Sequence, residues 1–124
     1  QYVTFTSITP VQLGLAVFLR DHPEHHLQLS AFYQAKRDLF CGLLSESRFA
    51  VRKSAGSFFQ LLDYSEYSSE KDTDLALRLT RQAKLASIPV SVFYEHDPGH
   101  TMLRFCFAKD DDTLRAGAKI LCNL

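Results

Sequence analysis

An arginine in the middle of an apolar run carries the clearest chemical signal in the 124-residue chain. Arg104 lies within the segment from Met102 to Phe107, whose other members are all apolar. Side chains alternate along a strand, so Arg104 is expected on one face, with Phe105 and Phe107 on the other. Such neighbours predict a covered strand, and a buried guanidinium is costly unless it is paired. We therefore expect Arg104 to have an anionic partner.

Two kinds of partner fit Arg104 equally well from the residues alone. One is a structural ion pair with an aspartate or glutamate of the same chain. The other is the carboxylate or phosphate of a ligand, which a planar guanidinium binds in a bidentate manner better than a lysine amine does. The residue types leave both alternatives open.

The other polar clusters have simpler explanations than catalysis or metal binding. The segment from Glu95 to His100 holds two histidines and two acidic residues, but its Asp-Pro-Gly core is typical of a surface turn. Asp110, Asp111 and Asp112 suit the positive end of a helix dipole. The sequence contains no glycine-rich phosphate loop and no G-x-S-x-G nucleophile motif. We predict no metal site and no catalytic residue in this chain.

The composition is that of an ordinary globular domain. Hydrophobic residues make up 46% of the chain and charged residues 23%, and 14 basic side chains balance 14 acidic ones. A net charge of zero argues against nucleic-acid binding and against a polybasic membrane-surface protein. No apolar stretch reaches the roughly 20 residues of a membrane span. Three widely spaced cysteines, Cys41, Cys106 and Cys122, favour a reducing compartment, and we expect a cytoplasmic protein.

Hydrophobic periodicity and capping residues predict four helices. They are expected over residues 10–20, 24–47, 73–84 and 111–122. Thr9, Asp72 and Asp110 are the expected caps of the first, third and fourth helix. Strands are expected over residues 49–51, 58–62 and 102–107, whereas Pro89 excludes a central strand from the apolar run 88–93.

These elements predict an α+β fold in which a small sheet of three to four strands is covered by helices on one side. A long helix leads into the sheet. The sequence shows no internal repeat and no obvious domain linker, so residues 1–124 are expected to form a single domain.

Five segments are distinctive in their order and spacing, and the most specific of them are I-P-V-S-V-F-Y and L-R-F-C-F-A-K. The five are T-S-I-T-P-V-Q (6–12), F-Y-Q-A-K-R-D (32–38), A-G-S-F-F (55–59), I-P-V-S-V-F-Y (88–94) and L-R-F-C-F-A-K (103–109). Together they closely resemble the C-terminal portion of fold-type I aminotransferases that use pyridoxal phosphate. The nearest branch resembles the methionine and kynurenine aminotransferases of class I and II. The resemblance runs over essentially the whole chain.

The resemblance implies roles for particular residues. Arg104 would bind the α-carboxylate of the substrate as a bidentate pair. Phe5 would lie near the subunit interface and reach toward the neighbouring active site, where Thr6 departs from the histidine of some relatives. Val92 and Phe93 would border the substrate pocket and contribute shape and water exclusion. Residues 1–22 would form an interdomain or subunit-interface segment of a homodimer.

The resemblance also implies what lies outside the chain. In relatives, the Schiff-base lysine and the rest of the pyridoxal phosphate site come from an upstream part, and no lysine here has that sequence context. Because Gln1 is not a start methionine, we expect a fragment of a longer enzyme. That parent would bind the cofactor and transfer an amino group between an amino acid (methionine, aromatic or kynurenine-like) and a 2-oxo acid. The chain alone should bind no cofactor and be inactive.

Two other interpretations remain. A stand-alone carboxylate-binding or protein-interaction module, derived from this domain, would keep anion binding at Arg104. An unrelated small α+β domain would instead use Arg104 in a structural ion pair. The aminotransferase fragment is the interpretation that all five segments support together.

Overall fold

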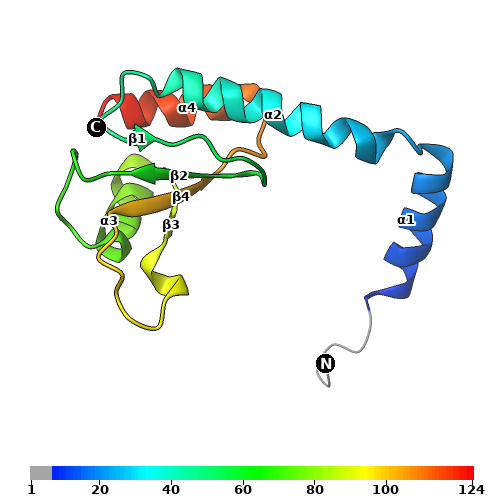
Figure 1. The fold of residues 1–124 in the computed structure, drawn as a ribbon, viewed down its shortest axis with the longest axis horizontal. Coiled ribbons are helices and arrows are strands. Elements are labelled where there is room, and N and C mark those ends of the chain that lie inside the picture. Colours follow the sequence, from blue (N-terminus) through cyan, green and yellow to red (C-terminus); the bar gives the residue numbers. More distant parts are fainter. Residues whose placement is uncertain (1–6) are drawn as a thin grey trace. The chain divides into compact units, whose positions relative to one another are not determined.

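The computed structural model describes residues 7–124 (Figure 1). The chain forms two compact units, with the boundary between Phe32 and Tyr33. The first unit holds α1 (Thr9–Asp21) and the start of α2 (His25–Leu43). The second unit holds the rest of α2, a four-stranded sheet and the helices that follow it.

The start of α1 differs by one residue from the prediction. Ile8 occupies the cap position and Thr9 is already helical, so the predicted capping by Thr9 is wrong. The side-chain amide of Gln12 donates to the carbonyl of Ser7 at 2.7 Å. This bond, and not a capping box, joins the first turn of α1 to the residue before its cap. Pro10 lies in the first turn as expected, because its fixed φ suits a helix start.

The helix α2 ends at Leu43, earlier than the predicted residue 47. Leu44 and Phe49 are each only 1% exposed, and the chain turns between them so that both reach the core. The hydroxyl of Ser47 donates to the Leu44 carbonyl at 2.8 Å. Such a local side-chain bond competes with continuation of the helix.

The sheet is antiparallel throughout and has the strand order β1-β2-β4-β3. Its strands are β1 (Ala50–Val51), β2 (Phe59–Asp63), β3 (Ile88–Pro89) and β4 (Met102–Cys106). Strand β3 was not predicted, but it lies at the edge of the sheet, where Pro89, a residue without an N–H to donate, is tolerated. Within residues 7–124, four α-helices with this four-stranded sheet confirm the predicted α+β class.

The cap predicted for the third helix is also wrong. α3 (Asp72–Arg78) begins at Asp72 itself, with Lys71 at the cap position, so Asp72 is not the cap. Its carboxylate is instead occupied by a tertiary contact with Ser91, described below. The helix then widens into a π-helical segment, Leu79–Ala83, which ends at Lys84 with a left-handed φ of 57°.

The last helix confirms the cap predicted for it. In α4 (Asp111–Cys122), Asp110 occupies the cap position, and its Oδ1 accepts from the Thr113 N–H at 2.7 Å. The hydrogen bonds from Thr113 hold the pKa of Asp110 below its ordinary value. The first helical turn carries two further acidic residues, as the helix dipole favours.

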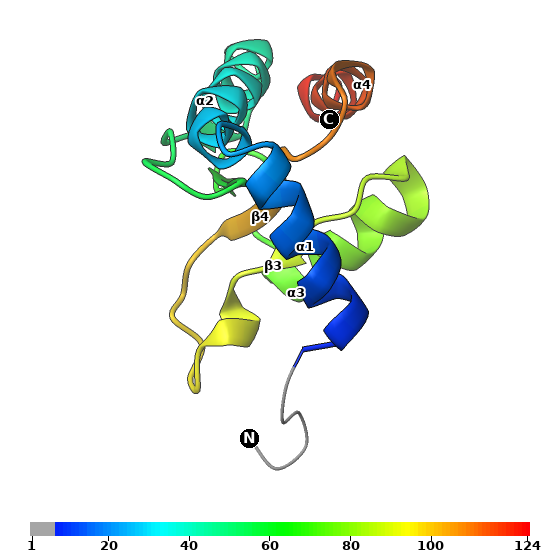
Figure 2. The same ribbon diagram turned by 90° about the vertical axis from the view of Figure 1, so that its right-hand side faces the viewer.

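One face of the sheet is covered by helices of the second unit. It presents Leu62 and Leu103, both 0% exposed, to a shared core. The core side chains from the helices include Phe40, Leu75, Leu79, Leu114 and Leu121. An ion pair of 2.6 Å between Lys36 and Asp111 joins α2 to α4, and both views show these helices side by side (Figures 1 and 2). The opposite face of the sheet carries Arg104.

Candidate functional site

Arg104 lies at the centre of β4, and two strands flank it. Its Cα pairs with that of Leu61 in β2 and with that of Ile88 in β3. Direct partners in antiparallel strands share a face, so Leu61 and Ile88 are on the same side of the sheet as Arg104. The neighbours Leu103 and Phe105, 0% and 4% exposed, point into the helix-covered core. The predicted alternation along this strand is therefore confirmed.

The guanidinium of Arg104 lies over two aromatic rings. Its Cζ lies 4.1 Å from the ring centroid of Phe59 and 4.9 Å from that of Phe93. A cation over a ring face is attracted by the ring quadrupole, with a strength of about 0.5–2 kcal/mol depending on desolvation. Both contacts engage the guanidinium through its π-system and leave its N–H donors to other partners.

Those donors have no partner within the part of the chain that the structure describes. The Nε of Arg104 is buried without a hydrogen bond, and none of the ion pairs among residues 7–124 includes Arg104. The structural ion pair that one alternative required is thus absent: no aspartate or glutamate among residues 7–124 pairs with Arg104. A buried donor left unsatisfied costs about 1–3 kcal/mol. Chemically, the arrangement can hold a planar anion such as a carboxylate through two parallel N–H···O bonds.

The turn between β3 and β4 brings one predicted pocket residue to Arg104. Val92 and Phe93 both lie in the 3-10 turn η2 (Ser91–Phe93) and are 57% and 60% exposed. Of the two, Phe93 reaches the guanidinium. Phe5 and Thr6, predicted near a subunit interface, lie outside the described residues.

Two residues that matter for this geometry were missed by sequence reasoning. Phe59 was assigned only to an apolar strand, and its place beside Arg104 depends on the register in which it pairs with Cys106. Asp72 was assigned only to helix capping. The sequence held one hint for Phe59, an aromatic residue two positions before Leu61 and therefore on the same face of the strand. The pairing of β2 with β4, however, is not encoded locally.

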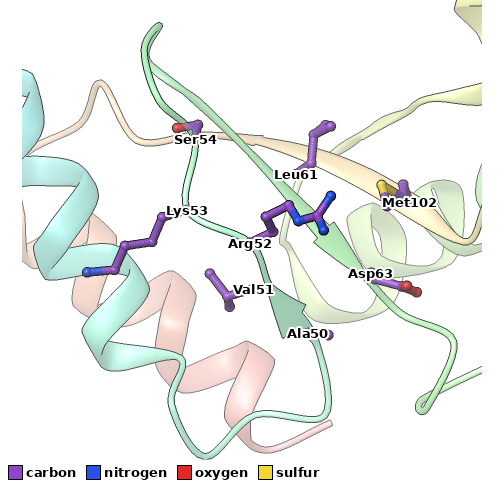
Figure 3. A pocket seen from close by; sticks show the side chains of 8 residues that line it. All are labelled: Ala50, Val51, Arg52, Lys53, Ser54, Leu61, Asp63 and Met102. Carbon is purple, nitrogen blue, oxygen red and sulfur yellow. The ribbon is translucent and has the colours of Figure 1, made fainter.

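A pocket of about 590 Å³ lies on the same face of the sheet, toward β1. It is lined by Ala50, Val51, Arg52, Lys53, Ser54, Leu61, Asp63 and Met102 (Figure 3). Figure 3 shows the Arg52 side chain extended toward β2. Partial burial acts to raise the pKa of Asp63, but hydrogen bonds from Thr101 and Ser65 together hold it below its ordinary value. Arg104 does not line this pocket, although Leu61 and Met102 are its neighbours in the sheet.

The histidine and aspartate clusters considered above do not assemble into a metal site. Among residues 7–124, no three His, Cys, Asp or Glu side chains lie together in a way that would hold a metal ion. The described helices are also too short or too polar for any of them to cross a membrane.

The comparisons with known proteins agree with this fold. A model of the family "aminotransferase class I and II" matches residues 3–121, and the chain therefore belongs to that family. It is 44% identical to the methionine aminotransferase of Escherichia coli over 124 residues, which are 100% of this chain and 32% of that protein. The chain thus spans about a third of the length of this curated relative.

Solved structures give the same result. A methionine aminotransferase from Escherichia coli, 44% identical, matches with a TM-score of 0.89 and covers 100% of this chain and 32% of its own. An N-succinyldiaminopimelate aminotransferase from Mycobacterium tuberculosis, 29% identical, matches with a TM-score of 0.85 and covers 99% and 32%. The resemblance drawn from the five sequence segments is confirmed.

Membership of the family implies pyridoxal phosphate in the parent enzyme, and such a cofactor needs a lysine amine inside a pocket. The described lysines do not provide one. Lys36 is paired with Asp111 at 2.6 Å, and the other lysines are exposed on the surface. Lys53, which borders the pocket of Figure 3, has a side chain that is 61% exposed. The residues of this chain therefore do not fit the cofactor.

Proposed function

We propose that this chain is the substrate-carboxylate-binding, C-terminal portion of a pyridoxal phosphate-dependent aminotransferase. The parent would transfer an amino group between an amino acid (methionine, aromatic or kynurenine-like) and a 2-oxo acid. The observation that carries the proposal is the buried Nε of Arg104, which lacks a partner among residues 7–124 while two rings hold the guanidinium.

The substrates of such a reaction share one group, the α-carboxylate. A guanidinium that binds this group serves the amino acid and the 2-oxo acid equally, because neither the amine nor the carbonyl is involved. Arg is suited to this task by its fixed fork, which a lysine amine lacks. Phe59 and Phe93 would limit the approach of water and so strengthen the ion pair with the carboxylate. Val92, in the same turn as Phe93, would form the border of the pocket.

The proposed function is tested by comparing the chain with its parent protein. The reading frame upstream of Gln1 should encode a Schiff-base lysine motif. The full-length product, supplied with pyridoxal phosphate, should transaminate methionine, an aromatic amino acid or kynurenine with a 2-oxo acid, whereas residues 1–124 alone should show no turnover. Transamination by the isolated chain would contradict the proposal, as would a full-length product inactive on all three substrates. A frame that stops just before Gln1 would favour the stand-alone carboxylate-binding module instead.

The first helix supports a proposed role for residues 1–22 as an interdomain or subunit-interface segment of a homodimer. α1 has no buried residue, and Val11, Leu13 and Leu15 are 62%, 64% and 53% exposed. Apolar side chains gathered on one short helix in this way are typical of a surface that is covered in an assembly.

We expect the isolated chain to self-associate through this helix. Sedimentation velocity should show a mass that rises with concentration, and Leu15→Glu should shift the distribution toward monomer because a charge opposes burial of the helix. The matched control is Gln28→Glu, which adds the same charge at an exposed polar position of α2. A monodisperse monomer at all concentrations for the unmodified chain would contradict the interface role.

A further inference from the structure

The buried carboxylate of Asp72 has an uncommon set of partners. Asp72 is 5% exposed, and it takes part in none of the ion pairs found among residues 7–124. Its two oxygens both bind Ser91: Oδ2 accepts from the backbone N–H at 2.7 Å and Oδ1 accepts from the hydroxyl at 2.6 Å. A carboxylate is buried only where hydrogen bonds compensate its lost hydration. Asp72, at the start of α3, therefore fixes the position of Ser91.

Ser91 in turn fixes the position of Phe93. The two residues are the first and last of the η2 turn, which the Tyr94 N–H closes by donating to the Ser91 carbonyl at 3.0 Å. The side chain of Phe93 receives little restraint from packing, since the residue is 60% exposed. Its ring nevertheless lies 4.9 Å from the Cζ of Arg104. The β3–β4 pairing and the bond from the Val90 N–H to the Met102 carbonyl at 3.4 Å hold the start of the turn, and the two bonds from Ser91 to Asp72 tie the turn itself to α3.

The two rings on the guanidinium are thus held by different means. Phe59 belongs to β2 and is fixed by the register of the sheet, whereas Phe93 belongs to a turn anchored at Ser91. We propose that Asp72 is a positioning residue for carboxylate binding, which keeps Phe93 against the Arg104 guanidinium by holding Ser91. The inference rests on the proposed function, because it assumes that Arg104 binds the α-carboxylate of the substrate.

The test measures carboxylate binding in the full-length protein loaded with its cofactor. Titration calorimetry with 3-phenylpropionate gives a dissociation constant that does not depend on turnover. Asp72→Ala should weaken this binding about fivefold, which is the loss expected when one cation–π contact no longer holds the guanidinium. Asp72→Asn should restore it to within about twofold, because the amide oxygen still accepts from the Ser91 N–H and the amide nitrogen donates to its hydroxyl. Unchanged binding in Asp72→Ala would overturn the inference.

A double-mutant cycle separates positioning from a general loss of stability. If Asp72 acts through Phe93, Asp72→Ala should have less than a twofold effect on the dissociation constant in a Phe93→Ala background. An equal effect in both backgrounds would overturn the inference. The matched control is Asp74→Ala, which removes the same charge from an exposed position in the first turn of α3 and should leave binding unchanged.

Two further variants keep the outcomes distinguishable. If Asp72→Ala does not fold, Ser91→Ala removes only the hydroxyl bond and should weaken binding about twofold, whereas an unchanged constant would overturn the inference. Arg104→Gln reports on the proposed function itself. Strong weakening in Arg104→Gln without any change in Asp72→Ala overturns only the positioning role. No change in Arg104→Gln overturns the proposed function.

Discussion

Replacing Arg104 by glutamine in the full-length protein should lower kcat/KM for the amino acid by roughly 30- to 5,000-fold. Removing one partner of a desolvated charge pair costs about 2–5 kcal/mol, and each 1.36 kcal/mol is a tenfold change in rate. The loss should be shared by the 2-oxo acid, since both substrates present the same carboxylate. Arg104→Lys should recover only part of it, because the amine keeps the charge but not the two parallel donors.

The measurement is steady-state kinetics with both substrates, together with the absorbance of the bound cofactor as a check that its site is intact. Arg115→Gln is the matched control, because it removes the same charge from an exposed position of α4 and should leave kcat/KM within about twofold. If Arg104→Gln retained the kinetics of the unmodified enzyme, Arg104 would have no part in substrate binding.

Replacing Gln60 by leucine should lower the free energy of unfolding by about 2–4 kcal/mol. Gln60 is 0% exposed, and its amide nitrogen donates to the carbonyl oxygens of Arg52 at 2.7 Å and Leu61 at 2.8 Å. Its amide oxygen accepts from the Ser54 N–H at 3.1 Å. Leucine has a similar volume but leaves the backbone groups of residues 52 and 54 without these bonds. Arg52 and Ser54, which line the pocket of Figure 3, would lose these bonds to β2, while the β1–β2 pairing would remain.

Urea unfolding of the 124-residue chain, followed by circular dichroism, would measure this loss as a lower midpoint. Gln34→Leu makes the same chemical change at an exposed position of α2 and should alter the free energy by less than about 0.5 kcal/mol. Equal midpoints for Gln60→Leu and Gln34→Leu would show that the hydrogen bonds of Gln60 add nothing to stability.

The sequence was sufficient to predict on which face of its strand Arg104 lies, but not which side chains contact it. Alternation within one strand depends only on neighbouring residues, so the face of Arg104 follows from the order of residues 102–107. Phe59 and Phe93 reach Arg104 from outside its own strand, and their meeting depends on the β2–β4 register and on the η2 turn. The role of Arg104 in binding carboxylate stays a prediction.

Helix boundaries show the same contrast. A boundary set by a neighbouring residue could be predicted, whereas one set by a distant residue could not. Asp110 caps α4 through a neighbour three residues on, and its role was predicted correctly. Asp72 has the same residue type at a helix start, yet its carboxylate is occupied by Ser91, 19 residues away in sequence. The early end of α2 likewise follows from the burial of Leu44 and Phe49, which no local pattern encodes.

The strands at the two margins of the sheet are both two residues long, and one of them contains Pro89. A sheet edge invites addition of a further strand when it offers a long row of free N–H and C=O groups. Here each margin offers few such groups, and the pyrrolidine nitrogen of Pro89 has no hydrogen to donate. The fold is accordingly a poor template for amyloid-like growth from its edges. Aggregation of this chain should therefore be amorphous and detergent-sensitive rather than fibrillar.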